Sequence, residues 1–473
     1  MKSPVRTVRT SIGVGSLVTC LLFSSACSAE LTDSAANSSG GNDASTRVAA
    51  NSRVIANGTI AIKGATLVDP SGGDTANAVV LITDGRVTAS GPASSIDIPS
   101  GTKTIEAQGK WIMPGLTDAF SSSMDTQWAG ANLYAGVTTL VNGSWAPIYD
   151  HGVPDLYDWP APRTYVQHVL GFTDPHGDPV PPAAYSDVLG AWASAGFTDA
   201  LLYRDLTNDQ EQAGIAQAHS LGLRTVSELG ITSGVQAAQA GTDALIHDTR
   251  YLLTATPDGA RQPPLVDPPN GPTLLQAMKP TDPGVQTLQA ALVKAGTSVI
   301  PTAVAECVQA LKPLPALQPA ANMLQNAAKA QEPGGMTIPR LPKPGDRSQM
   351  CNAMTAIDAS FAKAGVKQIA GSAAPVFGLM PGIALQQELQ QMVRIGLTPR
   401  QALASATTNP QTVLGLSGTG CLANGCNGDA VILNSDPTVD ILAAADISDV
   451  VLAGKQLDRT KLITFPAAAS ASK

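Results

Sequence analysis

Eight short apolar runs recur along the middle of the chain, and each is followed by a helical or loop segment. They read "IMPGLTDA", "GVTTLVNG", "RTYVQHVLG", "DALLYRDL", "LRTVSELG", "DALIHDT", "TSVIPTAVAE" and "VKQIAGSA". Helical patterns such as "NDQEQAGIAQAHSLG" lie between them. Eight strand–helix units within residues 113–417 predict an α/β fold of the (β/α)8 TIM-barrel type, whose active face lies at the C-terminal ends of the strands.

Alternating β-rich segments flank this region on both sides. "GTIAIKGATLVDP" and "AVVLITDGRVTASGP" precede it, and Asp84-Gly85 predicts a tight hairpin in the second of these. "GDAVILN" and "DISDVVLAGKQL" follow the barrel. Because the two groups enclose the barrel in sequence, we expect residues 56–112 and 418–465 to form one small composite β-sandwich.

The N-terminus has the pattern of a secretory signal over residues 1–26. Lys2, Arg6 and Arg9 precede an apolar stretch from Ile12 to Phe23 that is too short for a stable membrane-spanning helix. "SSAC" resembles a bacterial lipobox, which would make Cys27 the lipidated first residue of the mature chain; plain cleavage nearby is the alternative. Residues 27–55 are rich in Ser, Ala, Asn and Gly, as in a flexible tether. We therefore expect an exported protein, anchored by lipid at the bacterial periplasmic, outer-membrane or cell surface, or else secreted and soluble.

Four cysteines remain besides Cys20 and Cys27, and an even number in an exported protein favours disulfides. Cys421 and Cys426 bracket the turn-like "LANG", so we pair them with each other. Cys307 and Cys351 would then join the ends of a Pro-rich insertion, residues 307–351, on the active face of the barrel. The insertion suits a lid or a partner-binding arm, and a plain disulfide-closed loop is the alternative.

Several ordered motifs resemble those of the amidohydrolase superfamily, in particular its imidazolonepropionase-like and prolidase-like exported members. The matching segments are "GKWIMPGLTDAF", "AGVTTLVNG", "APRTYVQHVLGFTDPHGDP", "GLTPRQALASATTNPQTVLGL" and "NGDAVILN", within residues 58–455. The resemblance implies a barrel with one or two divalent metals, which activate a water for hydrolysis of C–N and sometimes P–O bonds. It also implies that an Asp on the eighth strand moves the proton.

Most metal-ligand positions of that family hold other residues here. In the order of the strands, the positions fall on Phe120, Ser122, Leu202, Glu228, His247 and Ala373. Of these, His247 is retained and Glu228 could still bind a cation, whereas Phe, Leu and Ala offer no donor atom. We therefore expect no cofactor. A single zinc ion held by His247 and Glu228 is the alternative to a hydrogen-bonded relic.

Three other positions could contribute to a pocket. His176 and Asp178 lie in "DPHGDP", which in relatives covers the pocket; they could contact a ligand or lie on an ordinary surface loop. Asp118 survives from the first-strand motif and could bond backbone or Ser neighbours.

An aromatic content of 4% and a net charge of −8 argue against nucleic-acid binding. The first hypothesis is a catalytically degenerate amidohydrolase-fold lipoprotein that binds a small molecule, a peptide or a partner. The alternative is an active hydrolase of amide, peptide or lactam C–N bonds, with a mono-metal or metal-free site around His247, Glu228 and His176. A scaffold role is a third possibility.

Overall fold

The computed structural model describes residues 57–121, 126–144, 160–171, 180–256, 271–330, 347–375 and 378–464. The expected signal peptide, Cys27 and the tether lie outside these ranges, as do Ser122, His176 and Asp178. No helix within the ranges is long and apolar enough to cross a bilayer.

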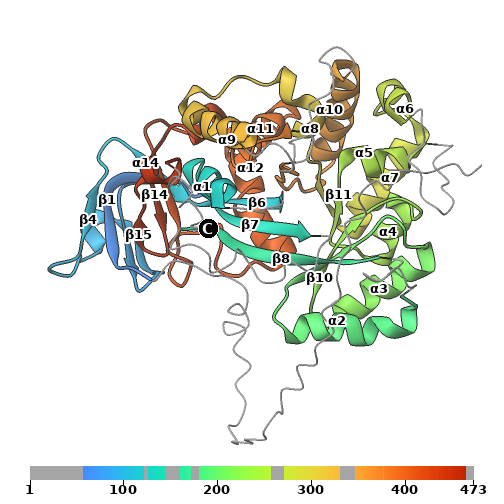
Figure 1. Cartoon of the computed structure of the whole chain (residues 1–473), viewed down its shortest axis with the longest axis horizontal. Helices are drawn as coiled ribbons and strands as arrows, with labels where there is room; N and C mark the ends of the chain where they lie inside the picture. Colours follow the sequence, from blue (N-terminus) through green and yellow to red (C-terminus); the bar gives the residue numbers. More distant parts are fainter. Residues whose placement is uncertain are drawn as a thin grey trace, which may run out of the picture. The chain divides into compact units, whose positions relative to one another are not determined.

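Seven parallel strands form the barrel sheet, in the same order as in the sequence. Figure 1 shows the first three, β6, β7 and β8, side by side. The strands are β6 (Leu116–Ser121), β7 (Val137–Ser144), β8 (Arg163–Leu170), β9 (Asp199–Leu202), β10 (Arg224–Glu228), β11 (Ala244–Ile246) and β12 (Ser298–Ile300).

The eighth predicted strand, residues 366–373, closes the barrel through backbone hydrogen bonds to both edges. Ile369 N–H donates to the carbonyl of Val299 on β12 at 2.9 Å. On the other side, Ala119 N–H of β6 donates to the carbonyl of Ala370 at 3.1 Å. The predicted (β/α)8 barrel is therefore confirmed, with an eighth segment that is less regular than the other seven strands.

Helices follow the strands, and local sequence signals set where several of them begin. The N-caps of α3, α4 and α12 are Thr207, Ser233 and Thr398, each in a capping box with a Gln three residues later. The helices are α1 (Thr126–Tyr134), α2 (Tyr185–Ser194), α3 (Asn208–Ser220), α4 (Gly234–Ala240), α5 (Asp248–Leu253), α6 (Gly271–Ala277), α7 (Pro283–Ala295), α8 (Val304–Cys307), α9 (Gln318–Ala330), α10 (Ser348–Lys363), α11 (Ile383–Arg394), α12 (Pro399–Ser405), α13 (Thr408–Leu414) and α14 (Arg459–Leu462).

Residues from both ends of the chain form a second, eight-stranded sheet. Its strands follow the order β15-β14-β13-β5-β1-β2-β3, and β4 also pairs with β1. N-terminal and C-terminal strands therefore share one sheet, as the sequence predicted, and Figure 1 shows them together in blue and red. The strands are β1 (Ile60–Leu67), β2 (Thr75–Thr83), β3 (Arg86–Pro92), β4 (Thr104–Glu106), β5 (Trp111–Pro114), β13 (Ala430–Leu433), β14 (Ile447–Leu452) and β15 (Lys455–Gln456).

The terminal sheet continues directly into the barrel, because Gly115 alone separates β5 from β6. A Cβ atom at Gly115 would lie 2.0 Å from the hydroxyl oxygen of Thr138 on β7, so a side chain cannot be placed there without a shift. On the barrel side of the sheet, Met113 and Val431 share an apolar core with Leu389 of α11. Burial of this core fixes the sheet against the barrel helices.

Both predicted disulfides are present. The Cys307–Cys351 bond joins the end of α8 to α10, and the Cys421–Cys426 bond closes the turn before β13. The described part of the 307–351 insertion includes α9, which buries Leu324 in one apolar cluster with Trp128 of α1. This part of the insertion is therefore a packed segment of the fold.

Asp118 links the first barrel strand to the eighth. Its carboxylate accepts hydrogen bonds from Ser372 N–H at 2.8 Å and from the Ser372 hydroxyl at 2.6 Å. It also accepts a longer bond from Phe120 N–H at 3.4 Å. Burial raises the pKa of Asp118 to about 7, against the lowering effect of these bonds. Asp118 therefore accepts hydrogen bonds from backbone and Ser neighbours, as the sequence analysis expected, and it joins the two strands that close the barrel.

We predict that Asp118→Ala lowers the free energy of unfolding by about 2–3 kcal/mol, because it leaves two buried donors of Ser372 without an acceptor. Urea unfolding would measure the loss. The control is Asp74→Ala, which removes a partly exposed carboxylate 2.8 Å from Arg400 and should cost at most about 1 kcal/mol. Equal losses in the two variants would contradict a special role for Asp118 in closing the barrel.

Candidate functional site

A cavity of about 460 Å³ lies at the C-terminal ends of the barrel strands. The strand ends contribute Phe120, Tyr203, Glu228 and Thr302 to its wall. Helices α5, α6 and α10 contribute the apolar side chains of Leu253, Leu275 and Met350 to the lining. This is the face at which (β/α)8 enzymes carry their active sites.

His247 lines this cavity and directly follows β11 in the chain. Its φ of 60° is unusual for a residue other than glycine, and it places the side chain in the cavity wall at the start of α5. The ring nitrogen Nδ1 lies 2.8 Å from the hydroxyl oxygen of Thr302. Burial, together with the charges of Arg250 and Arg204, lowers the pKa of His247 to about 3, so the imidazole is neutral.

The ring of Phe120 lies against the imidazole of His247. The two ring centroids are 5.1 Å apart and the planes are nearly perpendicular, at 88°. The phenyl ring also fills the space beside β7, since a Cβ atom at Gly143 would lie 2.3 Å from its Cε2 atom. Phe120 therefore places an apolar ring next to the one imidazole that the metal-ligand positions retain.

The charged groups of the wall pair with one another. Arg250 Nε lies 3.7 Å from Glu228 Oε1, and Arg347 forms an ion pair with Glu306. The guanidinium of Arg204 lies 5.2 Å from the centre of the Tyr203 ring. Glu228, the second potential ligand, is thus already engaged by a cation.

The described residues do not fit the metal centre that the family resemblance implies. Phe120 and Ala373 provide no donor atom, and Glu228 faces Arg250. No group of three or more His, Cys, Asp or Glu residues is arranged to hold a metal ion in the described part of the chain. Zinc sites take about four ligands, at least three of them from protein in catalytic sites, so His247 and Glu228 form at most half of one.

One sequence prediction is wrong: Leu202 does not line the cavity. It packs on the outside of the barrel against Ile215 of α3, in a cluster that also contains Leu206. Leu201 and Tyr203 are the residues of this segment that line the cavity. Side chains alternate between the two faces of a strand, and an alignment shifted by one residue exchanges inside for outside.

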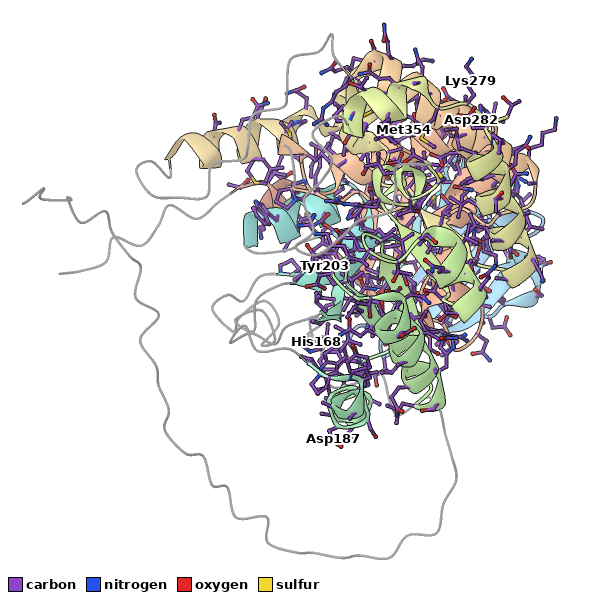
Figure 2. All side chains as sticks on the ribbon, turned by 90° about the vertical axis from the view of Figure 1, so that its right-hand side faces the viewer. His168, Asp187, Tyr203, Lys279, Asp282 and Met354 are labelled. Atoms are coloured by element: carbon purple, nitrogen blue, oxygen red, sulfur yellow. A yellow bond between two sulfur atoms is a disulfide. The ribbon has the colours of Figure 1, made fainter. Side chains whose placement is uncertain are left out.

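Several cavity residues have no sequence pattern around them that predicts a site. Arg204, Arg250 and Arg347 come from three separate segments, and nothing in their local sequence marks them as neighbours. Tyr203 could have been found from the alternation of side chains along the strand. In the view of Figure 2 it lies between His168 and Met354.

Two histidines that do not line the cavity contact neighbouring side chains of the fold. His168 stacks on Trp192 with ring centroids 5.0 Å apart, and His219 lies 2.9 Å from the carboxylate of Asp243. His176 and Asp178, the proposed covering loop, are outside the described residues.

Helices α5, α10 and α11 bring together three buried carboxyl groups, and that of Asp248 belongs to the cavity wall itself. Tyr251 donates a hydrogen bond to Asp358 at 2.9 Å, and Glu388 accepts bonds from Ala303 N–H and Val304 N–H at 3.2 and 2.7 Å. Burial raises the pKa of Glu388 to about 8, and it raises the pKa of Asp358 as well. Burial raises that of Asp248 further, with repulsion from Asp358 adding to the effect.

We predict that the folded protein loses stability as the pH rises. Asp118, Asp199 and Glu211 have pKa values raised to about 7 in the fold, and Glu388 to about 8, so the folded chain holds protons that the unfolded chain releases above about pH 4. Stability from these groups is complete below about pH 4 and is lost as the pH rises through 7 to 8. The free energy of unfolding should be at least about 2 kcal/mol lower at about pH 8.5 than at about pH 5.5.

Asp358→Asn tests a further contribution to this effect, because burial raises the pKa of Asp358 in the same direction. The amide keeps an acceptor for Tyr251 and cannot ionise, so the difference between the two pH values should shrink. Asp187→Asn, at an exposed position on α2, is the control and should leave the difference unchanged. A free energy of unfolding that is constant or rises over this range would contradict the prediction.

Comparisons with known proteins agree with this fold. A family model described as "Amidohydrolase family" matches residues 338–457, a range that includes the eighth strand, α11 to α13, β13 and β14. A comparison with curated protein sequences gives no match.

Solved structures share the fold over most of the chain. A molinate hydrolase superposes with a TM-score of 0.59 at 18% identity, covering 88% of this chain and all of that one. A bottromycin amidohydrolase gives a TM-score of 0.61 at 19% identity, covering 85% of this chain and 88% of the other. A structure described as a putative prolidase from Bifidobacterium longum gives 0.56 at 19% identity, with 85% and 95% covered. At these identities the likeness shows a shared fold.

Proposed function

We propose that this chain is a member of the amidohydrolase superfamily that is specialised for binding, and that the metal-dependent reaction has been lost. The family model that matches residues 338–457 and the fold shared with a molinate hydrolase support the assignment and a hydrolase-type ancestry. The observation that carries this proposal is the contact between Phe120 and His247 at 5.1 Å. An aromatic ring stands beside the retained imidazole, at a strand end where the resemblance implies a metal-binding His pair.

The cavity itself supports a role in binding. Its volume of about 460 Å³ is within the range of pockets for small molecules, roughly 300–1,000 Å³. Apolar side chains such as Leu253, Leu275 and Met350 line the same cavity as the polar side chains of Arg204 and His247. A small molecule or a short peptide with an apolar part and a few polar atoms suits such a lining.

We also propose that the protein acts outside the cytoplasm, attached to a membrane through acylated Cys27. The positive and apolar segments of residues 1–26 and the "SSAC" motif support export and lipidation. The two disulfides of the fold are consistent with an oxidising compartment.

A hydrolase of C–N bonds with a reduced site is the second candidate. It is favoured by the hydrolase relatives and by the presence of His247 and Glu228 in one cavity wall. Such an enzyme would use one metal ion or none, and His176 and Asp178 could complete its site.

Metal content separates the proposal from a mono-metal hydrolase. We predict near-zero zinc and manganese per chain when the protein, starting from Ser28, is produced in medium supplemented with both metals and purified without chelator or tag. Elemental mass spectrometry makes the measurement. One or more equivalents that disappear in His247→Ala would contradict the proposal and support a mono-metal hydrolase.

A panel of dipeptides and lactams then tests binding against turnover. Under the proposal, some members raise the melting temperature of the protein and are recovered unchanged. Hydrolysis that is abolished by His247→Ala would favour the second candidate.

Lipidation has its own test in a bacterial host. We predict that the full chain is recovered with membranes and incorporates labelled fatty acid, and that Cys27→Ala abolishes both. Cys20→Ala, within the apolar segment of the signal, is the control and should behave as the unaltered chain. Unlabelled, soluble protein from the full chain would show simple secretion instead.

A further inference from the structure

Three guanidinium groups of the described residues line the cavity at the strand ends, those of Arg204, Arg250 and Arg347. Two of them face carboxylates that line the same cavity. Arg250 Nε lies 3.7 Å from Glu228 Oε1, and Arg347 forms an ion pair with Glu306. Both carboxylate side chains are largely buried, so these pairs are poorly screened by water. Each of the two cations therefore has its counter-charge within the wall.

Arg204 is the cavity cation for which the described residues supply no carboxylate. Its side chain contacts the ring of Tyr203, with 5.2 Å between the guanidinium carbon and the ring centre. A guanidinium over an aromatic ring uses its flat face for this contact, and its N–H groups point outward in its own plane. Both residues line the cavity. The cation–π contact therefore holds Arg204 in place and leaves its N–H groups for another partner.

Asp248, the third acid of the wall, forms no ion pair with Arg204 in the described part of the chain. The residue is only 1% exposed. Its Oδ1 accepts a hydrogen bond from Thr249 N–H at 2.7 Å, and its Oδ2 is buried. The carboxyl of Asp248 is therefore turned into the protein, and the wall has one guanidinium more than it has carboxylates paired with guanidiniums.

The rest of the lining adds an apolar surface to this uncompensated charge. Leu253, Leu275 and Met350 line the same cavity. An anion that enters such a site supplies the missing counter-charge, and a carboxylate matches the planar fork of a guanidinium with two parallel hydrogen bonds. A dianion such as a phosphate monoester suits the wall less well, because its second charge would meet no free cation and would be repelled by Glu228 and Glu306.

We propose that the cavity selects an organic monocarboxylate with an apolar body, and that Arg204 is the residue that binds the carboxylate. The inference rests on the proposed function, because it names the class of ligand for the same cavity. The ligand needs no amide bond, since the wall recognises its anion and its apolar body.

A matched pair of small molecules tests the selection. 4-Phenylbutanoate and 4-phenylbutanamide have nearly the same shape, and only the first carries a charge at neutral pH. Calorimetric titration of the chain from Ser28 should show the carboxylate binding about tenfold tighter than the amide, as expected for hydrogen bonds between charged groups. Equal binding, or tighter binding of the amide, would overturn the proposal.

Variants of Arg204 test its role as the carboxylate-binding residue. Arg204→Gln removes the charge and should abolish the preference for the carboxylate, whereas Arg204→Lys keeps the charge and should retain part of it. The control is Arg224→Gln at the start of β10, since Arg224 is half exposed and lies 3.1 Å from Asp243, at the other end of the strand from the cavity. A preference that survives Arg204→Gln, or that Arg224→Gln removes equally, would overturn the assignment of Arg204.

Glu228→Gln tests the balance of charges in the opposite direction. The variant keeps the size of the side chain and removes the charge that faces Arg250. A second guanidinium then lacks a counter-charge, so 4-phenylbutanoate should bind several-fold tighter while the amide is unaffected. A gain in affinity cannot come from a variant that fails to fold. An affinity for the carboxylate that stays constant or falls would overturn the charge pairing on which the proposal rests.

The outcomes distinguish this inference from the proposed function. If the two probes bind equally, the cavity binds small molecules but the selection for an anion is wrong. If neither probe binds, the ligand class is wrong, and the panel of dipeptides and lactams decides separately whether the cavity binds small molecules. Hydrolysis of 4-phenylbutanamide to the carboxylate and ammonia, abolished in His247→Ala, would contradict the loss of catalysis, while tighter binding of the carboxylate would still support the inference.

Discussion

The hydrogen bonds between Asp118 and Ser372 are the contact on which the rest of the site depends. They join the first barrel strand to the irregular eighth segment at 2.8 and 2.6 Å, in a place where water has been excluded. A buried carboxylate that lost these donors would be unpaired, so the arrangement favours a closed barrel. Closure brings Phe120 and Ala373 together in one wall, and Ala373 N–H donates to the Phe120 carbonyl at 2.8 Å.

The resulting wall lies where (β/α)8 enzymes carry their active sites, but its side chains differ from those of a metal centre. Where a metal centre needs several donor atoms directed at one point, this cavity offers a neutral imidazole, a phenyl ring, and acids that already face cations. Desolvation favours the uncharged form of each buried group. It lowers the pKa of His247 and raises the pKa of the Glu388 carboxyl behind the wall. Under the proposed function, such a surface would recognise a ligand through hydrogen bonds and apolar contact.

The fold could be predicted from the sequence almost completely, because its signals are local and repeated. Eight apolar runs correspond to seven strands and the closing segment, and both cysteine pairs form as predicted. The site could be predicted only in part. His247 and Phe120 lie in the cavity wall, whereas Leu202 faces α3, because one residue of misalignment in a strand reverses the side. The ion pair between Arg347 and Glu306 was not predicted, although the predicted Cys307–Cys351 bond already joins the two ends of the insertion.

By itself the sequence determined the order of strands and helices, the cysteine pairing and the absence of donor atoms at Phe120 and Ala373. These follow from residue identity and from periodicity, which act over a few positions of the chain. Only the tertiary structure decided which side chains share a cavity, how the Thr302 hydroxyl orients the His247 ring, and which carboxyls keep their protons. Those properties depend on distance and on exclusion of water between segments far apart in the chain, and neither can be read from one segment alone.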